Sequence, residues 1–189
     1  MEADREIPRR LRSALLDSLE ERDLEALDSQ AVAVRAGVTV DAFEEHYGTL
    51  DQCVRATYQE VVDELYRRAA GALRSQDGDW QSRLVGTIAT SLEHLDEVPG
   101  AARLCLVESA RTGDAELHEC RSAARQRYIR LVADEYRRCE EPELPDLHFE
   151  FVIGAIYHAV HEEVVAGGRP GAARAQVREL LGVLEPAAA

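Results

Sequence analysis

The sequence contains no lysine. All 22 basic residues are arginine, and together with the many alanines this indicates the coding bias of a GC-rich genome rather than a function. The sequence also lacks an uninterrupted apolar run of the roughly 18 residues that a membrane span needs. Its first 20 residues carry charged side chains throughout and contain no signal-peptide core. We therefore expect neither membrane insertion nor secretion, and we expect the protein to be cytoplasmic.

Cysteine is scarce as well. Cys53, Cys105, Cys120 and Cys139 form no CxxC pair, and no set of histidines of the zinc-binding type lies near them. They are expected to be reduced thiols, buried or partly exposed. The signatures of hydrolases, GxSxG or a nucleophilic cysteine with a histidine, are missing too. The sequence therefore predicts no enzyme, no cofactor and no structural metal.

The strongest candidates for metal ligands are His158 and His161, which lie three residues apart on a predicted helix beside Glu162 and Glu163. Such spacing allows two imidazoles to chelate one ion. A pair without a third ligand more often has a structural or pH-sensing role at an interface. We therefore predict no metal here.

The chain has too few positive charges to attract nucleic acid over its whole surface. Its formal net charge is −14, and residues 1–55 hold 7 arginines against 13 aspartates and glutamates, a net charge of −6. This balance excludes a general polyanion-binding protein. It leaves room for a small patch that contacts DNA.

Apolar residues, 46% of the 189, recur at helical spacing nearly everywhere, and no segment alternates like a strand. Ile7, Leu11, Leu15 and Leu19 fall four apart on one face of a first helix, with Pro8 expected in its first turn. The first clear interruption is the polar stretch 75–79. The pattern predicts an all-α fold of about nine helices.

Two later segments are apolar on nearly all sides. Residues 101–108 are expected to form a buried central helix that ends at Gly113. The helix near 148–166 is the most apolar of the chain, and a last helix follows near 171–185. One domain of about this size can hardly cover the helix near 148–166 on all sides. We therefore predict a homodimer through these two helices.

The segment from Asp28 to Val54 carries the functional signal. Asp28 or Ser29 is expected to cap a short helix that ends at Gly37, and Thr39 to cap a third helix of barely two turns. Phe43 and Tyr47 would point inward from that third helix. Thr49 would open a long fourth helix that continues to about residue 74. Two short helices joined by a glycine turn are typical of a helix-turn-helix.

The spacing in this segment, Val32-Ala33-x-x-Ala36-Gly37-Val38-Thr39-x-x-x-Phe43-x-x-His46-Tyr47-Gly48-Thr49, resembles the DNA-binding domain of TetR-family transcriptional regulators. The resemblance implies a three-helix DNA-binding domain over residues 1–55 and a helical ligand-binding and dimerisation domain over residues 56–189. It implies a homodimeric repressor that binds operator DNA and responds to an unknown small-molecule effector.

The resemblance also implies where DNA contacts lie. The implied residues are Arg9, Arg10, Arg12, Arg35, Thr39, Val40, Asp41, Glu44, His46, Tyr47 and Thr49. Two positions depart from the family pattern, because Glu44 replaces a tyrosine and Leu50 replaces a lysine, both of which usually contact phosphate. These departures remove two phosphate contacts and add a carboxylate, which works against DNA binding.

The aromatic and soft residues of the second domain are candidates for a ligand pocket, although such residues more often form a core. The candidates are Trp80, Cys105, Glu108, Tyr128, Phe149 and Tyr157. A second hypothesis therefore stays open beside the regulator. The chain would then be a helical homodimer that does not bind DNA and acts as a small-ligand or protein-binding module.

Overall fold

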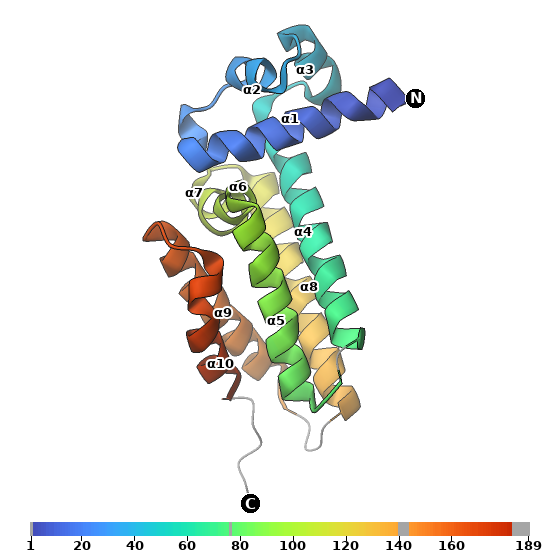
Figure 1. Ribbon diagram of the computed structural model, residues 1–189, viewed down its shortest axis with the longest axis vertical. Coiled ribbons are helices and arrows are strands. Elements are labelled where there is room, and N and C mark those ends of the chain that lie inside the picture. The colour runs from blue at the N-terminus through green and yellow to red at the C-terminus, as the bar shows by residue number, and fades with distance from the viewer. Residues whose placement is uncertain (1, 76, 140–143, 183–189) are drawn as a thin grey trace, which may run out of the picture. The chain divides into compact units, whose positions relative to one another are not determined.

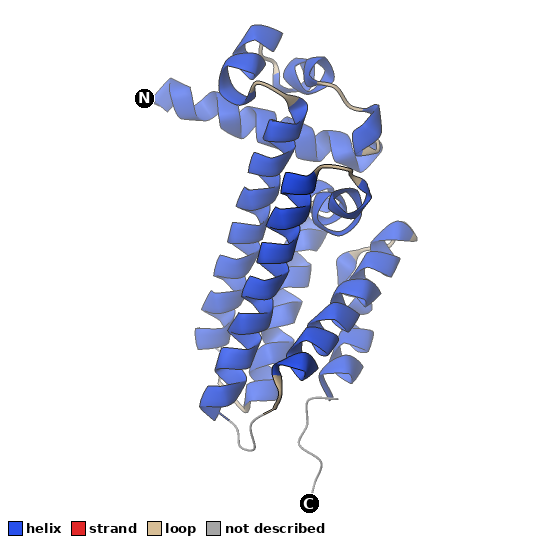
Figure 2. Cartoon of the chain, turned by 180° about the vertical axis from the view of Figure 1, so that it is seen from behind, coloured by secondary structure: helices blue, strands red, loops and turns tan. Residues whose placement is uncertain are grey.

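The computed structural model describes residues 2–75, 77–139 and 144–182, and every regular element within these ranges is helical (Figure 2). The helices in chain order are α1 (Glu2–Glu21), α2 (Ser29–Ala36), α3 (Val40–Tyr47), α4 (Leu50–Ser75), α5 (Trp80–Glu97), α6 (Pro99–Arg103), α7 (Ser109–Arg111), α8 (Ala115–Cys139), α9 (Asp146–Val165) and α10 (Arg174–Gly182) (Figure 1). A π-helical turn, Leu104–Glu108, joins α6 to α7. If these three segments are taken as one continuous helix, the described residues form nine α-helices. The prediction of an all-α fold is confirmed.

The helices form two compact units. The first unit comprises Met1–Val62 and Val98–Cys120, and the second comprises Asp63–Glu97 and Arg121–Ala189. The helices α4 and α8 contribute their first turns to the first unit and their later turns to the second. The division predicted from the sequence, 1–55 and 56–189, concerns function and stays a proposal. None of the described helices is long and apolar enough to cross a membrane.

The turn between α2 and α3 forms as the sequence predicts. The carboxylate of Asp28 accepts a hydrogen bond from the N–H of Ala31 at 2.7 Å, which caps α2. Gly37 ends α2 in the left-handed region, with φ of 65°, and the N–H of Val38 donates to the carbonyl of Ala33 at 3.0 Å. This closure brings the chain directly into α3.

Threonines begin the next two helices. The hydroxyl of Thr39 accepts from the N–H of Ala42 at 3.2 Å at the start of α3. Thr49 and Gln52 form a reciprocal capping box, in which each side chain accepts from the other residue's backbone N–H, at 3.3 and 3.2 Å. The predictions for Thr39 and Thr49 are confirmed.

The position predicted for Pro8 is wrong. The helix α1 begins at Glu2, so Pro8 lies inside it rather than in its first turn. Proline lacks the N–H of an ordinary residue, so the helix loses one backbone hydrogen bond at this position. Three of the four residues of the predicted stripe, Leu11, Leu15 and Leu19, are fully buried in the first unit, and Ile7 is half-buried.

The second unit is centred on aromatic side chains. Tyr136 of α8 is fully buried and lies edge-on to Trp80 of α5 and Phe149 of α9, with ring centroids 4.9 and 5.4 Å apart. Val177 and Leu181 of α10 are also buried in this unit. The aromatic core fixes α5, α8 and α9 against one another.

Candidate nucleic-acid interface

The third helix presents acidic side chains to solvent. Phe43 is fully buried, and its ring lies 5.9 Å from that of Tyr47. An α-helix turns by about 100° per residue, so positions 41 and 45 lie opposite Phe43 and position 44 lies to one side of them. These positions hold Asp41, Glu44 and Glu45, and all three are exposed. The outer side of the helix implied to contact DNA is therefore dominated by carboxylates.

Arg10, one of the implied phosphate contacts, is bound to the turn. Its guanidinium donates to the carbonyls of Ala36 at 2.5 Å and of Gly37 at 2.9 Å. Carbonyls at the end of a helix have no partner within it, and Arg10 supplies one from α1. The side chain thus fixes the end of α2 and the start of the turn that positions α3.

Arg12 lies between α3 and α4 in the first unit. It forms an ion pair with Glu60 at 2.6 Å, and its Nη1 donates to the hydroxyl of Tyr47 at 3.3 Å. Burial raises the pKa of Tyr47, which keeps the phenol neutral at physiological pH. Arg12 and Tyr47 are therefore brought together as one hydrogen-bonded pair.

Arg35 is also engaged inside the first unit. It pairs with Glu21 at 2.6 Å and donates to the backbone carbonyl of Asp17 at 3.2 Å. The hydrogen bond from Arg35 holds the pKa of the Glu21 carboxyl below its usual value. The guanidinium thus bridges α2 to the end of α1.

Of the remaining implied DNA contacts, Thr39 and Thr49 use their hydroxyls as helix caps. Val40 and His46 are partly exposed on α3. Arg9 is exposed, and the described part of the chain provides no hydrogen bond or ion pair to it. Of the four arginines implied to contact DNA, Arg9 is thus the one whose guanidinium makes no hydrogen bond or ion pair within the described residues.

The charge of the first unit does not favour a polyanion. Its residues include 9 arginines against 18 aspartates and glutamates, whereas the second unit has 13 arginines against 18. The unit that carries the helix-turn-helix is therefore the more acidic of the two. Long-range steering of DNA toward it is weak or repulsive at low salt.

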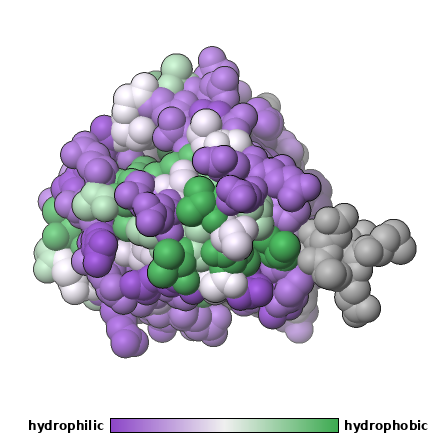
Figure 3. All heavy atoms as spheres, turned by 90° about the horizontal axis from the view of Figure 1, so that it is seen from above, coloured by the Kyte–Doolittle hydropathy of each residue, from purple (hydrophilic) through white to green (hydrophobic). Residues whose placement is uncertain are grey.

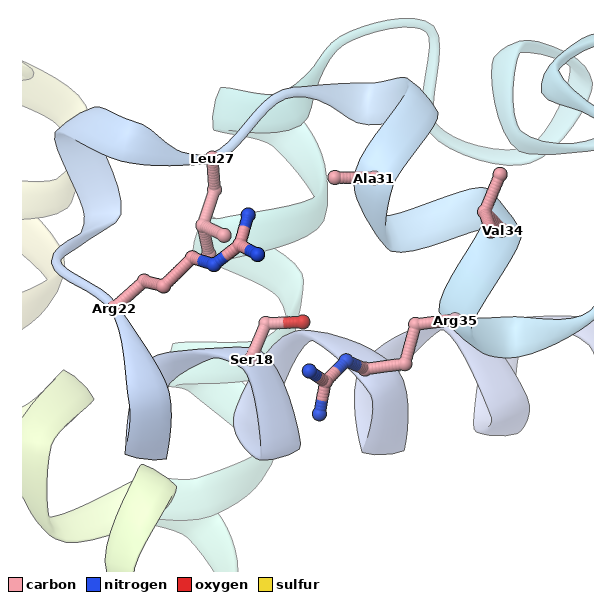
Figure 4. A pocket seen from close by; sticks show the side chains of 6 residues that line it. All are labelled: Ser18, Arg22, Leu27, Ala31, Val34 and Arg35. Carbon is pink, nitrogen blue, oxygen red and sulfur yellow. The ribbon is translucent and has the colours of Figure 1, made fainter.

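A hollow of about 370 Å³ lies between the end of α1 and α2 (Figure 4). It is lined by Ser18, Arg22, Leu27, Ala31, Val34 and Arg35. Val34 is 70% exposed beside it. Viewed from above, apolar side chains interrupt an otherwise polar surface (Figure 3). The sequence pattern does not predict this hollow, and its one signal is the valine at position 34, which is exposed whereas Val32 and Ala33 are buried.

Four of the predicted pocket residues lie in the second unit, where they belong to three separate clusters of rings. Trp80 and Phe149 flank Tyr136 in the aromatic core. Tyr128 lies edge-on to Tyr66, at 6.1 Å between ring centroids. Tyr157 stacks on His161 at 6.4 Å and lies under the guanidinium of Arg121 at 5.4 Å.

Cys105 and Glu108 belong to the first unit instead. Glu108 is 3% exposed, and its carboxylate accepts from Arg103 at 2.9 Å and from the backbone N–H of Leu24 at 3.2 Å. Arg103 also pairs with Asp23. Burial raises the pKa of the Cys105 thiol to about 12, so the thiol stays protonated. A ligand role for any of the six residues stays a prediction.

The ninth helix divides its apolar residues between two sides. Phe149, Val152, Ile156 and Val160 are buried within the second unit. Leu147, Phe151 and Val165 are 72, 65 and 49% exposed. They lie at helical spacing along one outward stripe, which is the surface that the predicted dimer would cover. His158 and His161 also lie on α9, and the described residues include no group of three side chains that could hold a metal ion.

Comparison with solved structures shows the fold. The fatty acid degradation regulator FadR from Bacillus halodurans superposes with a TM-score of 0.81 at 16% identity, over 94% of this chain and 96% of that one. FadR from Bacillus subtilis, solved in complex with stearoyl-CoA, gives a TM-score of 0.78 at 16% identity, over 91% and 96% of the two chains. A TetR transcriptional regulator from Rhodococcus sp. RHA1 gives 0.67 at 14% identity, over 98% of both.

The chain therefore has the fold of TetR-family transcriptional regulators over nearly its full length. No family model matches the sequence, and no curated protein matches it.

Proposed function

We propose that the protein is a ligand-responsive transcriptional regulator, a repressor that binds operator DNA as a homodimer. The observation that carries the proposal is the turn from α2 into α3. Asp28 and Thr39 cap the two helices, Gly37 closes the turn, and Phe43 anchors α3 in a fold otherwise found in solved regulators. The test is a mobility shift of the DNA upstream of the protein's own gene at low salt. Binding to neither that DNA nor random duplex would refute the proposal.

A second candidate function has its own support. The outer side of α3 is acidic, and Arg10, Arg12 and Arg35 make contacts within the protein. Both features favour a dimer that has lost DNA binding and works as a small-ligand or protein-binding module. The same mobility shift separates the two functions, because the module would leave every duplex unshifted.

The proposed mechanism is a shift between two arrangements of the dimer. The two recognition helices of a dimer must be about 34–36 Å apart to enter successive turns of the major groove. An effector that binds one arrangement better changes the fraction of dimers with this spacing. The Bacillus subtilis protein of this fold was solved with stearoyl-CoA, so a long-chain acyl-CoA is the first effector class to test.

The dimer surface is tested by Phe151→Asp. Ile156, although central in α9, is 8% exposed and belongs to the core, whereas Phe151 is 65% exposed. A carboxylate at position 151 would be buried without a partner in the dimer, which is strongly unfavourable. Light scattering should show the mass falling to that of one 21.0 kDa chain.

The matched control for this variant is Ala123→Asp, which adds a carboxylate at an exposed position of α8. It should leave the mass at twice that of one chain. A Phe151→Asp protein that stays dimeric would place the interface elsewhere.

Phosphate contacts are tested by restoring them. Glu44→Tyr removes a carboxylate from α3, and Leu50→Lys adds a cation at the start of α4. Each restored contact should strengthen DNA binding by about 1 kcal/mol at moderate salt. The gain should be equal on operator and random duplexes, because phosphates carry no sequence information. Fluorescence anisotropy at two salt concentrations measures both.

The control here is Glu119→Tyr, at an exposed position of α8 in the first unit. It should leave both affinities unchanged. If the double variant Glu44→Tyr, Leu50→Lys binds neither duplex more tightly than the wild type, the two positions do not face phosphates.

A further inference from the structure

The buried side chain of Phe43 shows which side of α3 faces outward. At about 100° per residue, the direction opposite Phe43 falls between Asp41 and Glu45, within about 20° of each. Glu44 lies about 80° to one side of that direction. Asp41 and Glu45 are exposed, and the described residues provide no hydrogen bond or ion pair to either. Any surface that faces α3 squarely must therefore meet these two carboxylates first.

The eight residues of α3 include no arginine, lysine, asparagine or glutamine. The common contacts to guanine, from arginine or lysine, and to adenine, from asparagine or glutamine, are thus missing from this helix. An ionised carboxylate has only acceptors. It is repelled by base edges that present acceptors, such as N7 and O6 of guanine or O4 of thymine.

Two bases present a hydrogen-bond donor in the major groove. Adenine places its N6 amino group next to the acceptor N7, whereas cytosine presents its N4 amino group alone. A carboxylate on adenine gains one hydrogen bond but approaches an adjacent lone pair. Cytosine therefore suits a carboxylate best, whereas guanine and thymine leave the carboxylate desolvated and unpaired.

We propose that α3 reads cytosine, with Asp41 and Glu45 each accepting a hydrogen bond from the N4 amino group of a cytosine in the operator half-site. The inference rests on the proposed function, since it assigns the sequence that the DNA-binding helix selects. Glu44, to one side, faces the groove wall and reads no base. Specificity in this protein thus depends on two acidic residues that would otherwise only weaken DNA binding.

The test is selection from a random duplex library at low salt by the wild type, Asp41→Asn and Glu45→Gln. The wild type should enrich half-sites with cytosines at two positions. Each variant should change one of those positions to adenine and leave the other as cytosine, because an amide pairs with N6 and N7 of adenine. On the selected duplex, replacing one of these cytosines should weaken wild-type binding roughly 5- to 150-fold.

Glu119→Gln, which neutralises an exposed carboxylate of α8 in the same unit, is the matched control and should select the wild-type half-sites. Half-sites without enriched cytosines overturn the inference, as do cytosines that persist at both positions in Asp41→Asn and Glu45→Gln. Either result leaves the proposed function standing. A library from which no protein retains DNA overturns the proposed function, and the inference with it.

Discussion

Gly100→Ala should destabilise the first unit by about 3 kcal/mol or more, which is a large fraction of the stability of a small domain. Gly100 lies at the start of α6 and packs against the backbone of α1. A β-carbon at this position would lie 2.6 Å from the carbonyl carbon of Leu16 and 2.9 Å from its α-carbon, with the carbonyl oxygen closer still. Real contacts of this kind are not observed, so α6 or α1 must move.

Moving either helix disrupts packed, buried side chains. Leu15 and Leu19 on either side of Leu16 are fully buried, and Ala101 and Ala102 after Gly100 are 1 and 2% exposed. Separating the two helices would open a gap beneath these side chains, and a gap too small for water loses van der Waals contacts outright. Urea unfolding followed by circular dichroism measures the loss in stability.

Gly71→Ala is the matched control, because it makes the same substitution inside α4 where a β-carbon would meet nothing within 4 Å. Alanine in a helix interior is more stable than glycine by about 0.5–1 kcal/mol. The two variants should therefore shift the unfolding midpoint in opposite directions. A Gly100→Ala protein as stable as the wild type would mean that α6 does not approach α1 this closely.

Local features of this fold could be predicted from the sequence because their partners are near in the chain. The cap at Asp28 contacts Ala31, the cap at Thr39 contacts Ala42, and Gly37 adopts a conformation that side chains disfavour. Each of these depends on residues within one helical turn. The caps and the turn of the helix-turn-helix were therefore predictable, with only the choice between Asp28 and Ser29 left open.

Long-range partners were not predictable in this way. Arg10 caps a helix 26 residues away, and Arg12 pairs with Glu60 on α4. In the sequence, both arginines are simply cations near a predicted DNA-binding helix. Only the packing of α1 against the turn shows that both guanidinium groups already bind groups of the protein itself.

The rotation of α9 about its own axis could not be predicted from the sequence either. Its apolar residues are spread around the helix, so the sequence does not indicate which side faces the core. From the sequence alone, Ile156 and Phe151 are equally good candidates for a residue of the dimer interface. In the structure, neighbouring aromatic rings decide it, because Phe149 packs on Tyr136 and sets the rotation of the helix.

Arg83→Ala should destabilise the second unit by about 3 kcal/mol, because it breaks a buried ion pair at one partner. The guanidinium of Arg83 donates to the carbonyl of Leu73, in the last turn of α4, at 2.7 Å, and pairs with Glu135 of α8. Glu135 is 4% exposed. Without Arg83, that carboxylate keeps Arg138 on its other side, but a side chain that is 64% exposed compensates for a buried charge only weakly.

The loss comes mainly from the charge that stays behind, and this distinguishes it from lost packing. Arg83→Met combined with Glu135→Leu should recover to within about 1 kcal/mol of the wild type, since apolar residues of similar volume replace a buried pair at little cost. Arg67→Ala removes one of the two arginines that pair with Glu64; Arg67 is exposed, so the change should cost less than about 0.5 kcal/mol. Thermal and urea unfolding of the four proteins, wild type included, measure these differences. If Arg83→Ala costs no more than Arg67→Ala, Glu135 is not held by Arg83, and the contact between α5 and α8 rests on the aromatic core alone.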